Sequence, residues 1–359
     1  MATETKRGVV LMNLGSPDST NVPDIKKYLD EFLMDDKVMD YPWLFRAFLV
    51  KGIIIPFRAP KSAAAYRSVW TENGSPLIEI TRQLKNALQT KIEEPISIAM
   101  RYGNPSPKNA FDELMKKSPD LEEVVLVPLY PHYAMSSFGT AVDYAREIHE
   151  KYNYPFKLDF IKPFYDNEVY LHALAENINS YLQKDYDHLL FSYHGVPERH
   201  IKKDDITQSH CLQTENCCGT PSPAHKYCYR HQCFQTTIEM VKRLQIPENK
   251  YSNSFQSRLG KGWLEPFTDK VLVAMPKQGI KKLLVVCPAF VSDCLETLEE
   301  IAEEGKEIFM HAGGEHYEMI PCLNVNELWV QALETWIGEV RNKDTNMLFE
   351  SPKHILFKV

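Results

Sequence analysis

Eight short runs rich in Val, Ile, Leu and Tyr recur along the chain of 359 residues, and they limit its fold more than any other feature. Four runs lie in the first half and four in the second, at 8–15, 96–103, 123–131, 157–164, 188–195, 251–260, 282–290 and 317–324. Runs of this length that are apolar on both faces suit strands covered by helices on each side. Amphipathic segments such as "VPDIKKYLDEFL" separate the runs, so the sequence predicts parallel sheets of the α/β class.

The even spacing of these runs also predicts how the chain divides. Four runs in each half predict two similar lobes, each a four-stranded parallel sheet flanked by helices. We expect an N-terminal lobe over 1–164, a C-terminal lobe over 165–327 and a final helix over 328–341. Ligands of such folds bind beyond the carboxyl ends of the strands. The residues that follow each run are therefore the first candidates for function.

Charge and the N-terminal residues exclude some classes of function. The formal net charge is −7, which argues against nucleic acid as the main partner, because binding phosphates requires a basic face. The start of the chain, "MATETKRGVVLMNLG", lacks the pattern of a signal peptide. No stretch reaches the roughly 18 apolar residues that a membrane span needs. We therefore expect a cytoplasmic protein, in a reducing compartment where structural disulfides are rare.

The longest apolar segment, "WLFRAFLVKGIIIPF" at 43–57, has two interpretations. It is either a core helix or an apolar lip that touches a greasy ligand or a membrane surface. The second interpretation would place the protein at the periphery of the inner membrane.

Two strand ends carry side chains suited to metal or proton chemistry. His194 closes the run "HLLFSYHG", and imidazole titrates near neutrality and binds iron. Glu296, Glu300 and Glu304 recur at intervals of four, which predicts a row of carboxylates along one side of a helix. A core histidine and a solvated acidic face are the alternatives. The chain has neither a P-loop nor a GxGxxG motif, so a dinucleotide site lacks support.

Six motifs in a fixed order resemble the ferrochelatase family, namely "NLGSPDS", "MRYGNPSP", "YPHYAMSSFGT", "SYHG", "FQSRLGKGWL" and "SDCLETLEE". The resemblance runs from about residue 8 to about residue 336. It implies a metal-chelating lyase of heme biosynthesis that inserts Fe2+ into a porphyrin and releases two protons. It also implies two Rossmann-like lobes with an active-site cleft between them, and a C-terminal helix that returns to the first lobe. Both protoporphyrin IX and coproporphyrin III fit as substrates.

The resemblance also implies roles for individual residues. His194 matches the family's pyrrole base or iron ligand, and Glu296 its catalytic glutamate across the cleft. Glu300 and Glu304 match its acidic path for the metal. The residues that would contact the porphyrin or its propionates are Leu14, Arg58, Tyr66, Ser75, Arg101, Tyr102, Tyr130, Tyr133 and Trp263.

Five of the eight cysteines lie in the segment 211–233. In a reducing compartment this density favours a metal site, and the segment resembles that of bacterial ferrochelatases with an internal [2Fe-2S] cluster. Such a cluster needs four thiolates. Because adjacent residues rarely both bind one cluster, we expect the ligands to be Cys211, Cys218, Cys228 and Cys233, with Cys217 as an alternative to Cys218. A zinc site and a segment without metal are the other interpretations.

Two other functions suit the same motifs. One is a carrier that binds heme or a metal without turnover, and the other is a chelatase that inserts cobalt into another tetrapyrrole. A carrier needs an axial ligand such as His194 but no carboxylate opposite it, so the pairing of His194 with Glu296 favours the enzyme.

Overall fold

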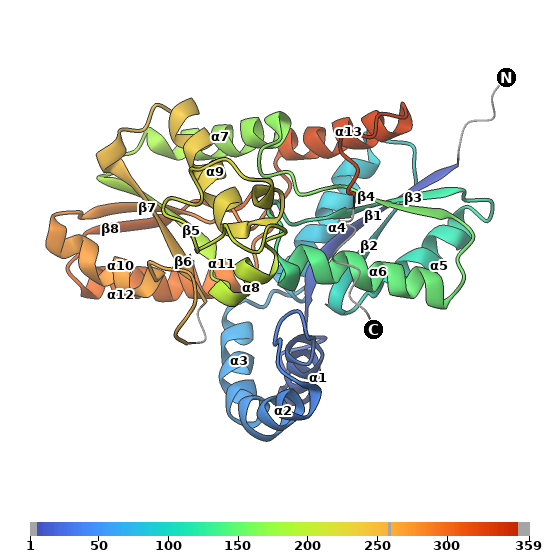
Figure 1. The fold of residues 1–359 in the computed structure, drawn as a ribbon, viewed down its shortest axis with the longest axis horizontal. Helices are drawn as coiled ribbons and strands as arrows, with labels where there is room; N and C mark the ends of the chain where they lie inside the picture. The colour runs from blue at the N-terminus through green and yellow to red at the C-terminus, as the bar shows by residue number, and fades with distance from the viewer. Residues whose placement is uncertain (1–5, 258–259, 351–359) are drawn as a thin grey trace. The chain divides into compact units, whose positions relative to one another are not determined.

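The computed structural model of the protein describes residues 6–257 and 260–350. They form two compact units. The first unit holds the described residues up to Leu129, Met135–Pro163 and those from Leu333 onward, and the second holds Tyr130–Ala134 and Phe164–Ala332. Each unit contains one four-stranded parallel sheet with helices packed against it, as Figure 1 shows. The predicted α/β class with two Rossmann-like lobes is confirmed.

The first unit is built on a sheet with the order β2-β1-β3-β4. Its strands are β1 (Arg7–Ser16), β2 (Ile96–Gly103), β3 (Glu123–Pro128) and β4 (Lys157–Phe160). Its helices are α1 (Val22–Leu33), α2 (Trp43–Ala47), η1 (Phe48–Ile54), α3 (Ile55–Val69), α4 (Pro76–Gln89), α5 (Pro107–Lys117), η2 (Met135–Gly139) and α6 (Thr140–Lys151). The central strand β1 is buried on both faces because α4, α5 and α6 all pack against it.

The second unit repeats this plan with the strand order β6-β5-β7-β8. Its strands are β5 (His188–His194), β6 (Tyr251–Gln256), β7 (Lys282–Val286) and β8 (His316–Met319). The helices that follow the first unit are α7 (Glu168–Leu182), α8 (Glu198–Lys203), η3 (Pro223–Tyr227), α9 (Tyr229–Arg243), η4 (Glu248–Lys250), α10 (Thr268–Ala274), η5 (Met275–Gln278), α11 (Leu295–Thr297), η6 (Leu298–Gly305), α12 (Lys306–His311) and α13 (Glu327–Arg341). The last of these, α13, begins in the second unit and ends in the first.

All eight predicted strands form, but several end earlier than the apolar runs suggest. The run at 123–131 stops pairing at Pro128, and the run at 282–290 stops at Val286, two residues before Pro288. Proline has no backbone N–H to donate to a sheet, so Pro131 and Pro288 cannot extend these ladders although the apolar character continues. The residues after β3 and after β7 therefore form loops, and both loops carry residues considered below.

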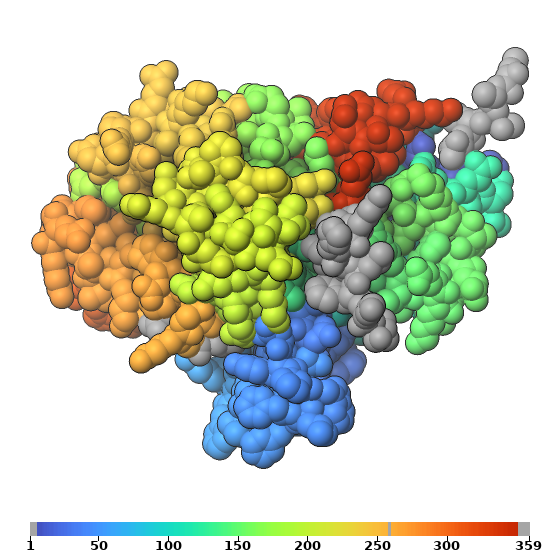
Figure 2. Space-filling view, in the orientation of Figure 1, coloured from blue at the N-terminus to red at the C-terminus, as the bar shows by residue number. Residues whose placement is uncertain are grey.

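The apolar segment at 43–57 is not a core helix, and this interpretation was wrong. It forms α2, η1 and the start of α3, and its large side chains face solvent: Leu44 is 77% exposed and Phe57 is 82% exposed. Trp43, Phe45 and Phe48 are exposed as well. Figure 2 shows this stretch, in blue, on the visible surface. We call these five side chains the apolar lip. No helix among the described residues is long and apolar enough to cross a bilayer.

Candidate functional site

His194 is the last residue of β5, and the neighbouring strand places Gln256 beside it in register. The imidazole is half-buried, and its ring lies edge-on to Phe290 with the centroids 6.2 Å apart. The backbone carbonyl of His194 accepts a hydrogen bond of 2.9 Å from the Tyr229 hydroxyl. Tyr229 is the first residue of α9, so this helix fixes the backbone of the strand end that carries the imidazole.

Gln256 connects His194 to the acidic helix. Its Oε1 accepts from the Ser192 hydroxyl at 2.8 Å, and its Nε2 donates to the Glu296 carbonyl at 2.9 Å. His194 and Glu296 therefore lie at the same edge of the second sheet, after the adjacent strands β5 and β7. Both residues belong to the second unit.

The three glutamates follow β7 on a helix that is not regular. Glu296 lies in the short α11, whereas Glu300 and Glu304 lie in η6, which is a π-helix. The predicted row of carboxylates assumed an α-helix, but the structure has a π-helix over Leu298–Gly305. Single π turns occur frequently at functional sites. The Cys294 thiol, two residues before Glu296, hydrogen-bonds to the Glu296 carboxylate.

The environment of Glu300 is unusual for a carboxylate. Burial raises the pKa of Glu300 to about 7, and the charges of Glu296 and Glu304 add to this against the opposing hydrogen bonds from Ser257. The Ser257 backbone N–H donates to Glu300 at 2.7 Å, and its hydroxyl donates to the other carboxylate oxygen. Ser257 has a φ of 63°, a region that residues with side chains rarely adopt. Glu300 thus holds a strained residue at the end of β6.

Asp293, just before this helix, serves the fold. It is buried, it accepts from Thr297 at 3.0 Å and from Asn324 at 2.6 Å, and it also accepts from the Cys322 backbone. These bonds fix the start of α11.

Trp263 lies close to the His194 strand end. It forms an isolated β-bridge with Pro197, and a Cβ on Gly195 would approach its ring to 3.4 Å. The same Cβ would lie 2.6 Å from the Gln256 carbonyl, so this position requires glycine. The tryptophan predicted from sequence is therefore adjacent to His194 in the second unit. The residues Arg258 and Leu259, inside the predicted motif "FQSRLGKGWL", lie outside the described residues.

Arg101 and Tyr102, both predicted to contact the substrate, make several contacts within the first unit. The Arg101 guanidinium donates to Asp35 at 2.5 Å and to Thr140 at 2.6 Å, and it lies over the rings of Tyr102 and Tyr144. Tyr102 is fully buried, with its hydroxyl 2.8 Å from Asp35. Burial raises the pKa of Asp35, but the charge of Arg101 opposes this, and the pKa lies below its usual range. Both side chains stabilise the interior of the first unit.

The other predicted substrate residues of the first unit are spread over several elements. Leu14 is half-buried at the end of β1, and Arg58 is half-buried on α3. Tyr66 is buried on α3 between Tyr28 and Trp70, and Ser75 is buried at the start of α4.

Tyr130 and Tyr133 belong to the second unit. Both are buried, and the Tyr133 ring packs edge-on against Tyr227, which ends η3 inside the cysteine-rich segment. The Tyr133 backbone N–H donates to Gln232 at 2.7 Å. Tyr133 therefore supports the cysteine-rich segment.

Four thiols of that segment contact one another. Cys218 hydrogen-bonds with Cys228 and with Cys217, and Cys228 also bonds with Cys211. Cys233 is fully buried on α9, and its thiol bonds with the Tyr229 hydroxyl. It interacts with Cys228 and Cys218 only electrostatically. The expected set with Cys233, and with one of the two adjacent cysteines left out, therefore does not match this arrangement. We call Cys211, Cys217, Cys218 and Cys228 the thiol cluster.

The loop turns sharply enough to bring both adjacent cysteines into the cluster. Leu212 and Asn216 both have positive φ, at 56° and 48°. The Arg230 guanidinium lies 3.2 Å from the Cys218 sulfur and 3.8 Å from the Cys217 sulfur, and the Leu212 backbone N–H donates to Cys217 at 3.3 Å.

The hydrogen bond with Cys228 and burial raise the pKa of Cys218, and they outweigh the charge of Arg230, which lowers that pKa. The pKa of Cys228 is also raised, to about 12, mainly by its hydrogen bond with Cys211.

Asp205 and Arg230 are residues of this site that the sequence interpretation did not include. Burial raises the pKa of Asp205. Hydrogen bonds from Thr207 and from the backbone N–H groups of Cys211 and His210 outweigh this and lower the pKa to about 2. The carboxylate thus fixes the first cysteine of the cluster. An Asp, or an Arg such as Arg230, close in sequence to clustered cysteines was the available signal.

The histidines of the segment are engaged with backbone. His210 and His225 bond the Cys217 carbonyl at 2.7 and 2.9 Å, and His231 bonds the Cys218 carbonyl at 2.8 Å. Among the described residues, no three or more His, Cys, Asp or Glu side chains surround a common point in the way a metal site requires. The thiols bond to each other, so metal binding would have to replace these bonds and release protons.

Comparisons with known proteins agree with one another. The family profile described as ferrochelatase matches residues 6–340. A curated ferrochelatase from Opitutus terrae is 46% identical over 339 residues, which cover 92% of this chain and 98% of the relative. One from Stutzerimonas stutzeri is 45% identical over 332 residues, covering 92% of this chain and 96% of the relative. The solved structure of SirB from Bacillus subtilis with Fe3+ covers 96% of this chain and 100% of that chain, with a TM-score of 0.52 and 12% identity, and shows a likeness of fold.

Proposed function

The chain belongs to the ferrochelatase family, whose members insert Fe2+ into a porphyrin in heme biosynthesis, and we propose that His194 and Glu296 carry this reaction here. The observation that carries the proposal is the Gln256 side chain, which bonds the Glu296 carbonyl from the strand position beside His194. The residues that carry one imidazole and one carboxylate thereby lie at the same edge of one sheet, where α/β folds bind their ligands.

The reaction requires removal of two pyrrole protons and delivery of a partly dehydrated metal. A neutral His194 imidazole would accept a pyrrole proton on a ring nitrogen. The Glu296 carboxylate accepts the other proton or binds the incoming cation, since carboxylate oxygens suit hard cations. Cys294 orients that carboxylate by donating a hydrogen bond to it from the thiol. Trp263, beside the same strand end, provides an apolar wall for the macrocycle.

The acidic row is proposed as the metal path. Glu304 is exposed, Glu300 and Glu296 are half-buried, and the three influence one another electrostatically. A cation would therefore move from solvent toward the His194 strand end along carboxylates that become less exposed. Ser257 occupies both oxygens of Glu300, so a cation at this position would displace those hydrogen bonds.

The remaining substrate residues are proposed from the family resemblance. Arg58 and Ser75 would contact propionates, because a guanidinium bonds carboxylates well, and Leu14 would contact the macrocycle. Tyr66, Tyr130 and Tyr133 would support the pocket from buried positions. We also propose that the lobes divide near residue 164 and that 328–341 forms the returning helix.

The reaction itself is tested by anaerobic turnover with Fe2+. Protoporphyrin IX and coproporphyrin III are supplied in separate reactions, and the loss of porphyrin fluorescence is followed. Turnover of either one supports the proposal and identifies the substrate. Tight binding of heme with no turnover of either porphyrin would favour a carrier, and turnover of only a reduced tetrapyrrole with Co2+ would favour the other chelatase.

For the cysteine-rich segment we propose a [2Fe-2S] cluster held by Cys211, Cys217, Cys218 and Cys228. Four thiols joined in a chain of hydrogen bonds match in number the four thiolates that such a cluster needs. Arg230 and the Leu212 N–H, which donate to the sulfurs, would stabilise their negative charge. A bound cluster supplies one-electron chemistry and a cross-link of the loop. The iron-insertion steps use neither.

Cys217→Ser is expected to abolish the absorption bands of the cluster and its iron and sulfide content in protein purified without air. Cys233→Ser is the matched control, because Cys233 lies in the same segment but outside the thiol cluster. It is expected to retain the bands, and thermal unfolding checks that it folds. Loss of the bands in Cys233→Ser but not in Cys217→Ser would overturn the ligand set. A colourless protein containing zinc would replace the iron–sulfur proposal with a zinc site.

The apolar lip is proposed to contact a membrane surface peripherally, from the cytoplasmic side. The five large apolar side chains of the lip are exposed, Lys51 lies within the same segment, and Arg58 follows it directly. Apolar side chains flanked by cations suit the interface of an anionic bilayer.

The double variant Leu44→Ser/Phe57→Ser is expected to weaken binding to vesicles of phosphatidylcholine and phosphatidylglycerol by at least about 10-fold, since one inserted apolar side chain contributes roughly 1.5–3 kcal/mol. Vesicle flotation measures this. Ile238→Ser is the control, because Ile238 is 51% exposed on α9 of the second unit. Equal binding of both variants and the unaltered chain would contradict membrane contact.

A further inference from the structure

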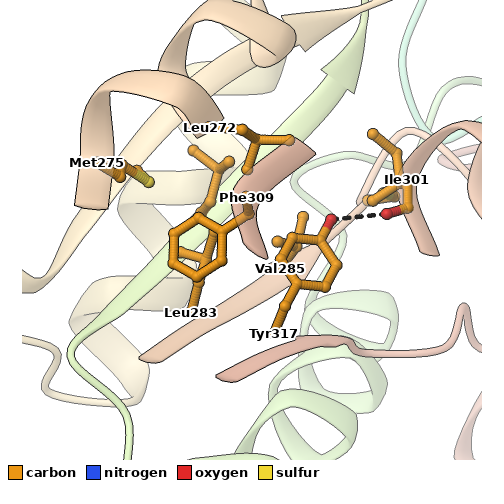
Figure 3. Close-up of a cluster of buried hydrophobic side chains, with 9 residues drawn as sticks. Leu272, Met275, Leu283, Val285, Ile301, Phe309 and Tyr317 are labelled. Atoms are coloured by element: carbon orange, nitrogen blue, oxygen red, sulfur yellow. Dashed lines mark hydrogen bonds between the residues drawn. The ribbon is translucent and has the colours of Figure 1, made fainter. Parts of the chain in front are cut away.

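A buried tyrosine lies behind the π-helix that carries the acidic row. Figure 3 shows Tyr317 in an apolar cluster with Phe309, Val285 and Leu272, with its hydroxyl directed at the Ile301 backbone. Tyr317 comes from the edge strand β8 and is 5% exposed. Its hydroxyl donates to the Ile301 carbonyl at 2.7 Å. The hydrogen bond thus joins the sheet to the middle of η6.

A second contact of Tyr317 depends on a glycine. A Cβ at Gly305 would lie 2.8 Å from the Tyr317 hydroxyl oxygen, which is too close for real Cβ atoms. Gly305 therefore lets the hydroxyl approach the helix, and it is the last residue of η6. Tyr317 contacts η6 at two positions, 301 and 305, about one π turn apart.

These two positions directly follow two members of the acidic row. Glu300 precedes Ile301, and Glu304 precedes Gly305. A π-helix is rare and usually short, so a side chain that bonds its backbone from the core helps to retain that geometry. If the turn relaxed to an α-helix, residues 300 and 304 would rotate relative to Glu296, because the angle between successive residues changes.

We propose that Tyr317 is a positioning residue of the iron-insertion reaction, which holds the π turn so that Glu300 and Glu304 stay in line with Glu296. This inference rests on the proposed function of the acidic row. On this proposal the buried cluster around Tyr317 contributes to metal delivery as well as to the stability of the second unit.

The test is Tyr317→Phe, which removes one oxygen atom and keeps the ring. A lost hydrogen bond of this kind is worth about 1 kcal/mol, so we expect KM for Fe2+ to rise roughly 3- to 10-fold with KM for the porphyrin unchanged. Gly305→Ala, which forces the hydroxyl away, is expected to give the same split. The control is Leu283→Val on β7, which trims the same apolar cluster without touching a hydrogen bond.

Binding of Co2+ to the porphyrin-free protein, followed by its visible absorption, gives a readout that does not depend on turnover. Tyr317→Phe and Gly305→Ala are expected to weaken it, and Leu283→Val to leave it unchanged at a similar loss of thermal stability. If Tyr317→Phe matches Leu283→Val in both measurements, the tyrosine is only structural and the inference is wrong. Glu300→Gln, measured in parallel, separates the two levels: if it also leaves KM for Fe2+ and Co2+ binding unchanged, the proposed metal path itself fails.

Discussion

Replacing His194 with alanine is expected to lower kcat for iron insertion by about 10²- to 10⁴-fold, the range that a positioned general base contributes. The alanine removes the only imidazole at the end of β5, while the Tyr229 bond to the backbone carbonyl at this position is retained, because it does not involve the side chain. The strand end should therefore keep its conformation. The rate of porphyrin fluorescence loss with saturating Fe2+ measures the effect.

The control for His194→Ala is His172→Ala, which removes an exposed imidazole on α7 of the same unit. It is expected to leave kcat unchanged. A loss of less than about 10-fold in His194→Ala, in a variant whose thermal unfolding matches that of the control, would mean that another group takes the pyrrole proton.

Glu296→Gln is expected to lower kcat by about 10²- to 10³-fold, in the range for general acid–base groups. Glutamine has the same size and still accepts the Cys294 hydrogen bond through its amide oxygen, so the change removes charge rather than shape. Because the Glu296 backbone carbonyl receives the Gln256 bond, that link to the His194 strand end is also unaffected. Steady-state assays with Fe2+ and with Zn2+ measure the effect for two cations.

The matched control for Glu296→Gln is Glu303→Gln, which neutralises an exposed carboxylate on the same helix but outside the acidic row. Equal losses in the two variants would show that the net charge of the helix matters and not the position of Glu296. In the double variant His194→Ala/Glu296→Gln the losses should combine less than additively, since the two groups act on one reaction.

The strands could be predicted from sequence because burial on both faces leaves an apolar run that composition alone reveals. The π-helix could not be. The spacing of Glu296, Glu300 and Glu304 fits an α-helix equally well, and the contact that distinguishes the two comes from Tyr317 on β8. The ion pair of Arg101 with Asp35 likewise joins residues distant in sequence, so the sequence carried no sign of it.

The cysteine-rich segment illustrates a third limit. The density of cysteines was readable, but the choice among the five depended on the course of the loop, which Leu212 and Asn216 set through positive φ. Asparagine adopts positive φ more often than most residues, so Asn216 was a weak sign of a turn, but Leu212 gave none. The apolar lip shows the reverse case: its composition was readable, but its exposure required the fold.

The hydrogen bond from Tyr229 to the His194 carbonyl has a thermodynamic consequence. Tyr229 follows Cys228 directly and also bonds with Cys233, so the backbone that ends in the imidazole and the loop that carries the thiols share one contact. If the loop changes its arrangement and the Tyr229–His194 hydrogen bond changes with it, the free energy of the conformation at the end of β5 changes as well. Linkage of this kind is reciprocal: whatever stabilises one arrangement of the thiols favours one setting of His194, and a ligand held at His194 acts back on the thiols with equal strength.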